Sequence, residues 1–409
     1  MTRILLLCPE PLGHRNPAGV GIRFLEFGRM LRRAGHEVTV LTPDSADIEG
    51  CTSGDLTPQS IRESSSKAGV AVVQGHVAND FFAHAEPVPT VIDLYDPFIV
   101  ENLHYTDLGA QTFAHDHDTL MRSLDRGDFF LCASEVQRTF YLGLLLAAGR
   151  INPESFASDP NLDEIISVVP FGVPEPMPSV VPRPASHDLL FGGIYDWYEP
   201  QIAIDAVALA RTTIGSLTLA FTTHPNADLT PQGVFGETKR YVERRGFGEF
   251  VRFQPWTAYE DRADHYSRFG AAILTFPHSL ETDLAMRTRI FDFFWGGLPV
   301  ITSSARGTDP LIRHYDAGIV IESNEPAEFA RAILELFADR DRYDRYVEGA
   351  RRFTADHQWD RLGEPLLSFA RSPHFEPTRQ RYRRRDNGTI TTPRPSILTR
   401  LRRRFGGLF

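Results

Sequence analysis

Residues 4–7 of the chain read Ile-Leu-Leu-Leu, and residues 37–41 read Glu-Val-Thr-Val-Leu. The first run has the length and apolar character of a strand that is buried on both faces of a parallel sheet, and the second is predicted to be another strand. Between them, apolar residues recur near helical spacing from Ile22 to Leu31, and Gly35 ends that helix. The first forty residues therefore predict a strand–helix–strand unit, the building block of a doubly wound α/β fold.

The same alternation continues along most of the chain. Further strands are expected at residues 70–73, 90–93, 129–132 and 166–169, and then at 189–191, 217–221, 251–253, 271–274, 299–302 and 318–321. Between the two series, residues 170–184 contain six prolines, which stiffen the backbone and remove hydrogen-bond donors. We therefore predict two Rossmann-like parallel-sheet domains, over residues 1–172 and 185–370, joined by a Pro-rich hinge over residues 173–184. Ligands of such sheets bind at the carboxyl ends of the strands, here in an inter-domain cleft.

Length and composition agree with this prediction. A chain of 409 residues is long enough for two or three domains, each with its own core. The longest apolar run, residues 141–148, is far shorter than the roughly 20 residues of a membrane-spanning helix. The N-terminus does not have the pattern of a signal peptide. Three cysteines without metal-ligand spacing favour a reduced, cytoplasmic protein.

The net charge of −10 is unevenly distributed. Residues 371–409 carry eleven Arg and two acidic residues, so this basic tail has a charge of +9 and residues 1–370 have a charge of −19. The acidic body argues against nucleic acid as the main partner. Within residues 379–409, apolar residues lie at helical spacing among the arginines. This pattern fits peripheral contact with an anionic membrane, at the inner face of the plasma membrane, and equally a basic tail that only aids solubility.

A glycine-containing loop follows the first strand. Gly19 and Gly21 precede a helix, where glycines let backbone N–H groups approach an anion. A dinucleotide fingerprint requires another glycine three residues after Gly21, but that residue is Phe24. The sequence also contains no Gly-Lys-Ser or Gly-Lys-Thr phosphate loop. Dehydrogenase, kinase and ATPase functions are therefore disfavoured.

The most informative motif is at residues 281–302, Glu-Thr-Asp-Leu-Ala-Met-Arg-Thr-Arg-Ile-Phe-Asp-Phe-Phe-Trp-Gly-Gly-Leu-Pro-Val-Ile-Thr. A helix that begins near Asp283 places Arg289 and Asp292 three positions apart on one face. Its N-terminus, with Arg287 or Arg289, suits a diphosphate, and the Asp292 carboxylate suits a ribose diol. A nucleoside diphosphate contains both groups. The alternative is an amphipathic helix with a surface Arg–Asp ion pair.

These motifs resemble those of glycosyltransferases of the GT-B fold, and most closely the retaining family 4 group, over about residues 1–370. The stretch Gly35-His-Glu-Val is similar to a strand of that family, and Gly19-Val-Gly to its glycine loop. The run from Arg289 to Val300 is similar to the family's Lys-x-x-Glu-Tyr-x-x-x-Gly-x-Pro-Val. The resemblance implies that Asp292 holds the donor ribose and that Arg289 meets the donor phosphates.

The resemblance also implies an activity. We expect a hexosyltransferase-type enzyme that moves a sugar from a nucleoside-diphosphate donor to an acceptor hydroxyl with retention, in bacterial polysaccharide, glycolipid or natural-product glycoside synthesis. The leaving diphosphate can deprotonate the acceptor on the same face, so that charge stabilisation and orientation carry the catalysis. Asp93 and Asp96 do not form an Asp-x-Asp triplet, and arginines can take the role of a cation. We therefore expect neither metal nor cofactor. A membrane-binding tail would suit a lipid-linked or polysaccharide acceptor.

The candidate site residues follow from strand ends and from the resemblance. The expected donor-binding residues are Gly19, Gly21, Gly193, His278, Glu281, Arg287, Arg289 and Asp292, and the catalytic candidates are His76, Asp93 and Asp96. Two features depart from the family pattern. Leu284 is found where relatives have a first glutamate, for which Glu281 or Asp283 could substitute, and the stretch after Gly193 lacks the usual Arg and Lys. A catalytically inactive sugar-nucleotide-binding relative or scaffold is therefore the main alternative. An epimerase and a paired-carboxylate hydrolase are weaker ones.

Overall fold

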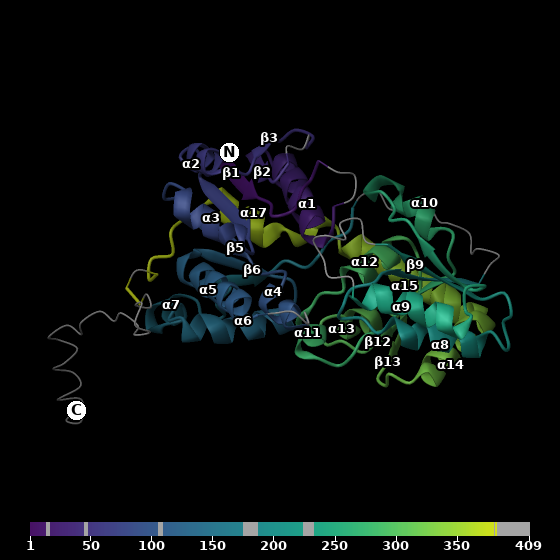
Figure 1. Ribbon diagram of the computed structural model, residues 1–409. Helices are drawn as coiled ribbons and strands as arrows, with labels where there is room; N and C mark the ends of the chain where they lie inside the picture. Colours follow the sequence, from purple (N-terminus) through teal and green to yellow (C-terminus); the bar gives the residue numbers. More distant parts are fainter. Residues whose placement is uncertain are drawn as a thin grey trace, which may run out of the picture.

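The computed structural model describes residues 1–13, 17–44, 48–104, 109–174, 187–223, 233–379 and 381–382. These residues form two parallel sheets with helices packed around each, which lie side by side in Figure 1. The predicted fold class, two Rossmann-like parallel-sheet domains, is confirmed. In the described residues, no helix has both the length and the hydropathy that crossing a membrane requires.

The first domain is built on a sheet with the strand order β3-β2-β1-β4-β5-β6-β7. Its strands are β1 (Arg3–Leu7), β2 (Glu37–Thr42), β3 (Thr52–Asp55), β4 (Val70–Gln74), β5 (Thr90–Asp93), β6 (Phe129–Cys132) and β7 (Ile166–Val168). Its helices are α1 (Gly19–Arg33), α2 (Pro58–Ser65), α3 (Val77–His84), α4 (Phe98–Glu101), α5 (Ala110–Arg126), α6 (Glu135–Ala147) and α7 (Pro153–Ser158). Ile4 and Leu6 of β1 join one apolar cluster and Leu5 and Leu7 another, so β1 is buried on both faces.

The second domain repeats this plan with the strand order β10-β9-β8-β11-β12-β13. Its strands are β8 (Asp188–Gly193), β9 (Thr218–Thr222), β10 (Val251–Gln254), β11 (Ala271–Leu274), β12 (Val300–Ser303) and β13 (Gly318–Ile321). Its helices are α8 (Pro200–Ala210), α9 (Gly233–Arg245), α10 (Arg262–Tyr266), α11 (Leu280–Leu284), α12 (Thr288–Trp295), α13 (Asp309–Tyr315), α14 (Pro326–Ala338) and α15 (Arg340–Asp356). In each sheet the order reverses beside the first strand, which creates a crevice at the carboxyl ends of β1 and β8.

The helix expected to begin near Asp283 is two helices, which corrects the prediction. α11 ends at Leu284, and Ala285 has an extended backbone with φ −66° and ψ 133°. α12 begins only at Thr288. Across the break, Arg287 pairs with Glu281 at 2.6 Å.

The chain returns to the first domain before its predicted boundary at residue 370. α16 (Trp359–Leu362) and α17 (Glu364–Arg371) pack beside α1 and the first sheet, where Figure 1 shows α17 in yellow among purple and blue elements. Phe369 stacks on Phe129 with ring centroids 5.0 Å apart, and the Thr2 hydroxyl donates to the Ala370 carbonyl at 2.7 Å. Most of the predicted hinge, residues 175–184, lies outside the described residues.

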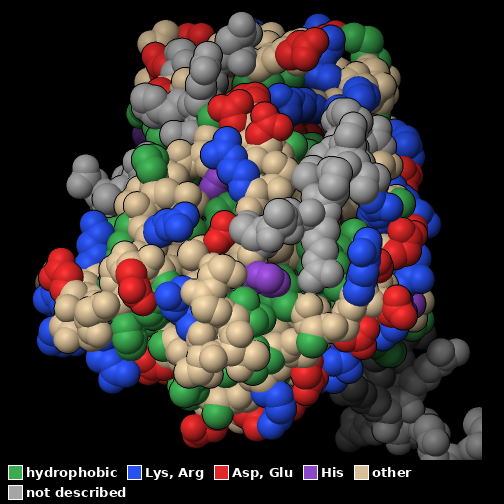
Figure 2. Space-filling model, turned by 90° about the vertical axis from the view of Figure 1, so that its right-hand side faces the viewer, with side chains coloured by type: hydrophobic (Ala, Val, Ile, Leu, Met, Phe, Trp, Pro, Cys, Tyr) green, Lys and Arg blue, Asp and Glu red, His purple; other side chains and the backbone are tan. Residues whose placement is uncertain are grey.

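Charged side chains of both signs are mixed on one face of the molecule. On the face shown in Figure 2, which views the molecule from the right-hand side of Figure 1, basic and acidic side chains are interspersed. This face therefore has no extended patch of a single charge among its described residues.

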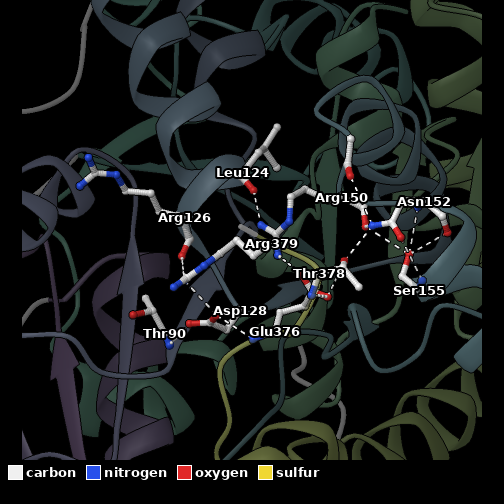
Figure 3. Close-up of polar contacts among 11 residues, drawn as sticks. Thr90, Leu124, Arg126, Asp128, Arg150, Asn152, Ser155, Glu376, Thr378 and Arg379 are labelled. Carbon is white, nitrogen blue, oxygen red and sulfur yellow. Dashed lines mark hydrogen bonds and ion pairs between the residues drawn. The ribbon is translucent and has the colours of Figure 1, made fainter. Parts of the chain in front are cut away.

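The start of the predicted basic tail is a docked segment. Figure 3 shows residues 376–379 against the first domain, where Asp128 accepts a hydrogen bond from the Glu376 backbone at 2.9 Å and pairs with Arg379 at 2.9 Å. Arg150 pairs with Glu376 at 3.3 Å, and Asn152 donates to the Thr378 hydroxyl at 2.8 Å. Residues 372–379 and 381–382 therefore belong to the first domain, whereas residues 383–409, with most of the predicted amphipathic segment, lie outside the described residues.

Candidate functional site

A cleft between the two domains lies at the carboxyl ends of β1 and β8. Its main cavity, of about 280 Å³, continues into a smaller one of about 70 Å³ that shares Trp256, Arg289 and Asp292 with it. Five predicted residues line the main cavity, namely Gly19, Asp96, Arg287, Arg289 and Asp292. Gly193 lines the smaller one. The cleft therefore collects predicted residues from both domains.

Asp292 lies on α12 with one carboxylate oxygen fixed. Arg262 Nη1 is 2.6 Å from Asp292 Oδ1, and the Arg262 guanidinium is 3.7 Å from the centre of the Tyr259 ring. Burial raises the pKa of Asp292, and the guanidinium of Arg262 opposes that rise. The result is an oriented carboxylate at the cleft, which is the chemistry that a vicinal diol needs.

Arg289 is held against the end of β8. Its Nη1 donates to the Gly193 carbonyl, and its guanidinium is 4.8 Å from the centre of the Tyr195 ring. Gly192 has φ +85°, and a Cβ atom there would come within 2.9 Å of the Arg289 side chain. A Cβ at Gly193 would lie 3.1 Å from Trp256. The glycines at this strand end thus make room for Arg289 and Trp256.

Glu281 and Arg287 form a buried ion pair between α11 and α12. Two guanidinium nitrogens of Arg287 lie 2.7 and 2.6 Å from the two carboxylate oxygens of Glu281. The guanidinium also faces the Phe276 ring at 4.6 Å. Arg287 lines the cavity, whereas Glu281 is fully buried beside it. The carboxylate expected to replace the missing glutamate at Leu284 is therefore engaged by an arginine.

Asp96 and Glu101 form a carboxyl pair on the first-domain side. Burial raises the pKa of both, and the hydrogen bond between them raises that of Glu101 further and opposes the rise at Asp96. Two carboxyl groups in contact must share a proton, which we place on Glu101. Gln74, at the end of β4, also bonds Asp96. Both carboxyl groups line the main cavity, so the pair can donate and accept a hydrogen bond there.

The geometry of Asp93 does not fit the catalytic role predicted for it. Arg23 Nε and Nη2 lie 2.7 and 3.0 Å from the two Asp93 oxygens, and neither side chain is exposed. Arg23 also donates to the Pro170 carbonyl at 3.1 Å. The side chain of Asp93 thus faces α1 rather than the cavity. Strand-end position alone could not reveal this pairing, because Arg23 is 70 residues away in sequence.

The two predicted histidines lie outside the lining of the cleft. His76 Nε2 is 2.7 Å from Asp116 Oδ1, and its ring stacks on His115 with 5.2 Å between centroids. His278 is exposed, and its Nε2 is 3.1 Å from the Glu322 carbonyl oxygen. Neither ring reaches the described walls of the cavity, so their predicted contacts with substrate have no geometric support.

Sequence reasoning missed Glu10, a carboxylate on the cavity wall. The backbone N–H groups of Ala18 and Gly21 donate to Glu10 Oε2, each at 3.1 Å. A Cβ at Gly21 would lie 2.7 Å from the same oxygen, so the carboxylate approaches only because residue 21 is glycine. Burial raises the pKa of Glu10 to about 7. The signal in the sequence was a carboxylate three residues after the first strand.

Direct contacts hold the two domains together beside the cleft. The amide of Gln137, in the first turn of α6, donates to the carbonyls of Tyr95 and Leu284, both at 2.9 Å. The Tyr259 hydroxyl donates to Glu26 on α1 at 3.1 Å. In the part of the chain that the structure describes, no three His, Cys, Asp or Glu side chains form a group suited to a metal ion.

The C-terminal sheet domain matches a known family. Residues 189–339 match the model of the family Glycosyl transferases group 1. D-inositol 3-phosphate glycosyltransferase 1 of Catenulispora acidiphila is 27% identical over 158 residues, 38% of this chain and 36% of that protein. The putative glycosyltransferase YtcC of Bacillus subtilis is 35% identical over 72 residues, 16% of this chain and 18% of that protein. The matched segments thus span about a third or less of these curated relatives.

Solved structures match over nearly the whole chain. Sucrose-phosphate synthase from Thermosynechococcus elongatus superposes with a TM-score of 0.65 at 16% identity, over 91% of this chain and 98% of that one. HepE from Anabaena, in complex with UDP and glucose, superposes with a TM-score of 0.67 at 14% identity, over 91% of this chain and 100% of that one. WaaG, a glycosyltransferase involved in lipopolysaccharide biosynthesis, superposes with a TM-score of 0.62 at 13% identity, over 90% of this chain and 100% of that one. Residues 189–339 therefore form a domain of the glycosyl transferases group 1 family, within a chain that has the GT-B fold.

Proposed function

We propose that this chain is a glycosyltransferase that moves a sugar from a nucleoside-diphosphate donor to an acceptor hydroxyl. The observation that carries the proposal is that α12, in the matched domain, places a cation, Arg289, and a carboxylate, Asp292, on the lining of the inter-domain cleft. A cation suits the donor phosphates, and an oriented carboxylate suits the donor ribose. The complex of HepE with UDP and glucose supports a ligand of this class in a chain of the same fold.

The donor would extend along the cleft from the smaller cavity into the larger one. Asp292, which lines both, would bind the ribose, with the base toward Trp256 and the Tyr259 side of the smaller cavity. The diphosphate would then meet Arg289, and the sugar would enter the main cavity near Arg287. This order places the bond to be broken between the two domains.

The chemistry we propose is transfer with retention. The bond between the sugar C1 and the diphosphate oxygen breaks, and its electron pair leaves with the nucleoside diphosphate. The acceptor oxygen bonds C1 on the same face and passes its proton to the leaving diphosphate. Arg289 stabilises the charge that develops on the diphosphate, so the proposal includes neither a metal nor a protein nucleophile.

The acceptor would bind on the first-domain side of the cavity. Asp96 is the predicted catalytic carboxylate that reaches this cavity, and together with Glu101 it offers a hydrogen-bond donor and an acceptor to a sugar hydroxyl. A role in polysaccharide, glycolipid or glycoside synthesis is part of this proposal. So are the cytoplasmic location and the contact of residues 379–409 with an anionic membrane.

Thermal melts with UDP, GDP, ADP, TDP and CDP test the donor class. A diphosphate that binds only the folded state adds about 2.7 kcal/mol at 100 times its dissociation constant. We expect one of the five to raise the melting temperature of the wild type, and Asp292→Asn to lose most of that shift. Asp264→Asn, which removes an exposed carboxylate on α10, should keep it. A wild type that no diphosphate stabilises, or an unchanged shift in Asp292→Asn, would contradict the proposal.

One observation favours the second candidate function, an inactive sugar-nucleotide-binding relative. Leu284 carries no carboxylate, and the cleft residues that follow Gly193 are Tyr195, Trp197 and Tyr198, without the cations expected there. Release of nucleoside diphosphate from the matching sugar nucleotide separates the two candidates. A binder would show the thermal shift without any release, whereas the enzyme would show both.

A further inference from the structure

Glu10 occupies a position where an anion would otherwise bind. Its carboxylate accepts hydrogen bonds from the backbone N–H groups of Ala18 and Gly21, at the start of α1. We call these two N–H groups the α1 cradle. The cradle lies beside the end of β1, in the crevice where ligands of open α/β sheets bind. The protein thus places its own carboxylate where a donor phosphate could bind.

This arrangement differs from that of the fully buried acids. Each of them forms an ion pair with an arginine or a histidine. The pairs are Glu26–Arg29, Asp93–Arg23, Asp116–His76, Asp128–Arg379, Glu281–Arg287 and Glu376–Arg150. Among the described residues, Glu10 has the α1 cradle as its partner instead of a side-chain cation. Its charge is therefore matched by the positive end of a 15-residue helix.

A phosphate and the Glu10 carboxylate cannot share the α1 cradle. The carboxylate oxygen lies so close to Gly21 that a Cβ there would be only 2.7 Å from it, which leaves no room for a second oxygen. Two anions in one cavity would also repel each other. The cations that line the described cavity, Arg287 and Arg289, both belong to the second domain.

We infer that Glu10 is a specificity-determining residue that fills the α1 cradle in place of a donor phosphate and confines the diphosphate to the arginine-bearing wall of the second domain. This inference rests on the proposed function, because it concerns the donor of that reaction. It reverses the role expected for the loop of Gly19 and Gly21. The N–H groups that suggested phosphate binding hold a protein carboxylate, and phosphate recognition depends on Arg289.

Binding of inorganic pyrophosphate and of the five nucleoside diphosphates, measured by calorimetry, tests the inference. Glu10→Ala empties the cradle, so we expect at least about tenfold tighter pyrophosphate binding than in the wild type, since two hydrogen bonds to a charged oxygen become available. Glu10→Gln should gain less, because its amide oxygen still accepts both bonds. Backbone amide resonances of Ala18 and Gly21 should shift with pyrophosphate in Glu10→Ala and not in the wild type.

Asp44→Ala is the matched control. Asp44 also accepts backbone N–H bonds from the loop after β1, from Leu12 at 2.9 Å and Gly13 at 3.1 Å, but it does not line the cleft. We expect the pyrophosphate affinity of Asp44→Ala to stay within about twofold of the wild-type affinity, a change of less than about 0.5 kcal/mol. A gain as large as that of Glu10→Ala would show that loosening the loop is enough, and would overturn the inference.

Weaker or equal pyrophosphate binding in Glu10→Ala would overturn the inference as well. If Glu10→Ala does not fold, Glu10→Gln decides, since a loss of affinity there has the same meaning. The pyrophosphate experiment does not depend on any nucleotide, so a failure of the Glu10 inference can be told apart from a failure of the proposed function. A pyrophosphate gain without nucleoside diphosphate binding in any variant contradicts the proposed function alone. Nucleoside diphosphate binding that weakens in Glu10→Ala contradicts the role of Glu10 alone.

Discussion

Carboxyl groups around the cleft fall into two kinds according to their partners. Glu281 and Asp292 each bind the guanidinium of an arginine. Glu10, Asp96 and Glu101 have amides or one another as partners, and burial raises the pKa of each. In the first kind an arginine holds the carboxylate in place for recognition. In the second kind burial favours the protonated form, so that the charge of the first-domain wall depends on pH.

Glu10 should make the stability of the protein depend on pH. Its pKa is raised from 4.5 to about 7 in the folded state, so the folded protein binds this proton more tightly than the unfolded chain does. The stabilisation is complete below about pH 4.5 and is lost as the pH rises through about 7. We expect the free energy of unfolding, measured in urea, to fall between pH 5 and pH 8. Glu10→Gln should reduce that fall by roughly 2 kcal/mol.

Burial also raises the pKa of Asp96 and of Glu101, so these groups too destabilise the folded protein as the pH rises. Part of the fall in the free energy of unfolding should therefore persist in Glu10→Gln. A pH profile of the variant that superposes on that of the wild type would be incompatible with a raised pKa at Glu10.

The sequence was sufficient for every described strand except β3 (Thr52–Asp55), which it does not predict, and it was insufficient for the side-chain partners. β1 and β12 could be located because both faces of a parallel strand are apolar, so the signal is in consecutive residues. Arg289 and Asp292 could be assigned to one cleft because they share one short helix. The Asp93–Arg23 pair and the approach of Glu10 to Gly21 depend on how β5, β1 and α1 pack, which spacing does not encode.

At the scale of secondary-structure elements, the returning segment completes the first domain. α17 places Phe369 on Phe129, and residues 372–382 add charged partners for Asp128 and Arg150. The arginine content of residues 371–409 predicts a separate basic tail instead. The acidic partners that bind these arginines lie more than 200 residues earlier in the chain, so composition alone did not indicate docking.

Deletion of residues 372–409 should destabilise the protein more than deletion of residues 383–409. The longer deletion removes Glu376 and Arg379 and leaves Arg150 and Asp128 buried without these partners, which costs about 3 kcal/mol or more. We expect its melting temperature to be lower by roughly 6 °C or more than that of the shorter deletion. Calorimetry on both chains measures this difference, and equal melting temperatures would show that the docked segment contributes nothing.

At the scale of the whole molecule, a few contacts set the relation between the domains. Gln137 is fully buried and joins the Tyr95 carbonyl of the first domain to the Leu284 carbonyl of the second. The bond from the Tyr259 hydroxyl to Glu26 on α1 is a second contact between the domains. Both lie next to the cavity, so the width of the cleft depends on them.

Gln137→Ala should loosen the closed arrangement. The substitution leaves two buried carbonyls without their donor, at a cost of about 1 to 3 kcal/mol each unless the domains separate and water reaches them. We expect a larger radius of gyration by small-angle X-ray scattering than in the wild type. Gln59→Ala, on the exposed face of α2, is the control and should leave the scattering curve unchanged. Superposable curves for Gln137→Ala and the wild type would exclude this amide as a determinant of closure.

The return of the chain to its first domain has a consequence for biosynthesis. When residues 1–174 have left the ribosome, Arg150 and Asp128 still lack Glu376 and Arg379, and Phe129 lacks Phe369. At about 5 to 20 residues per second, the missing segment follows roughly 10 to 40 s later. The second domain can be complete during this interval, although it is synthesised later. The first domain is therefore the half that chaperones and proteases meet unfinished on every round of translation.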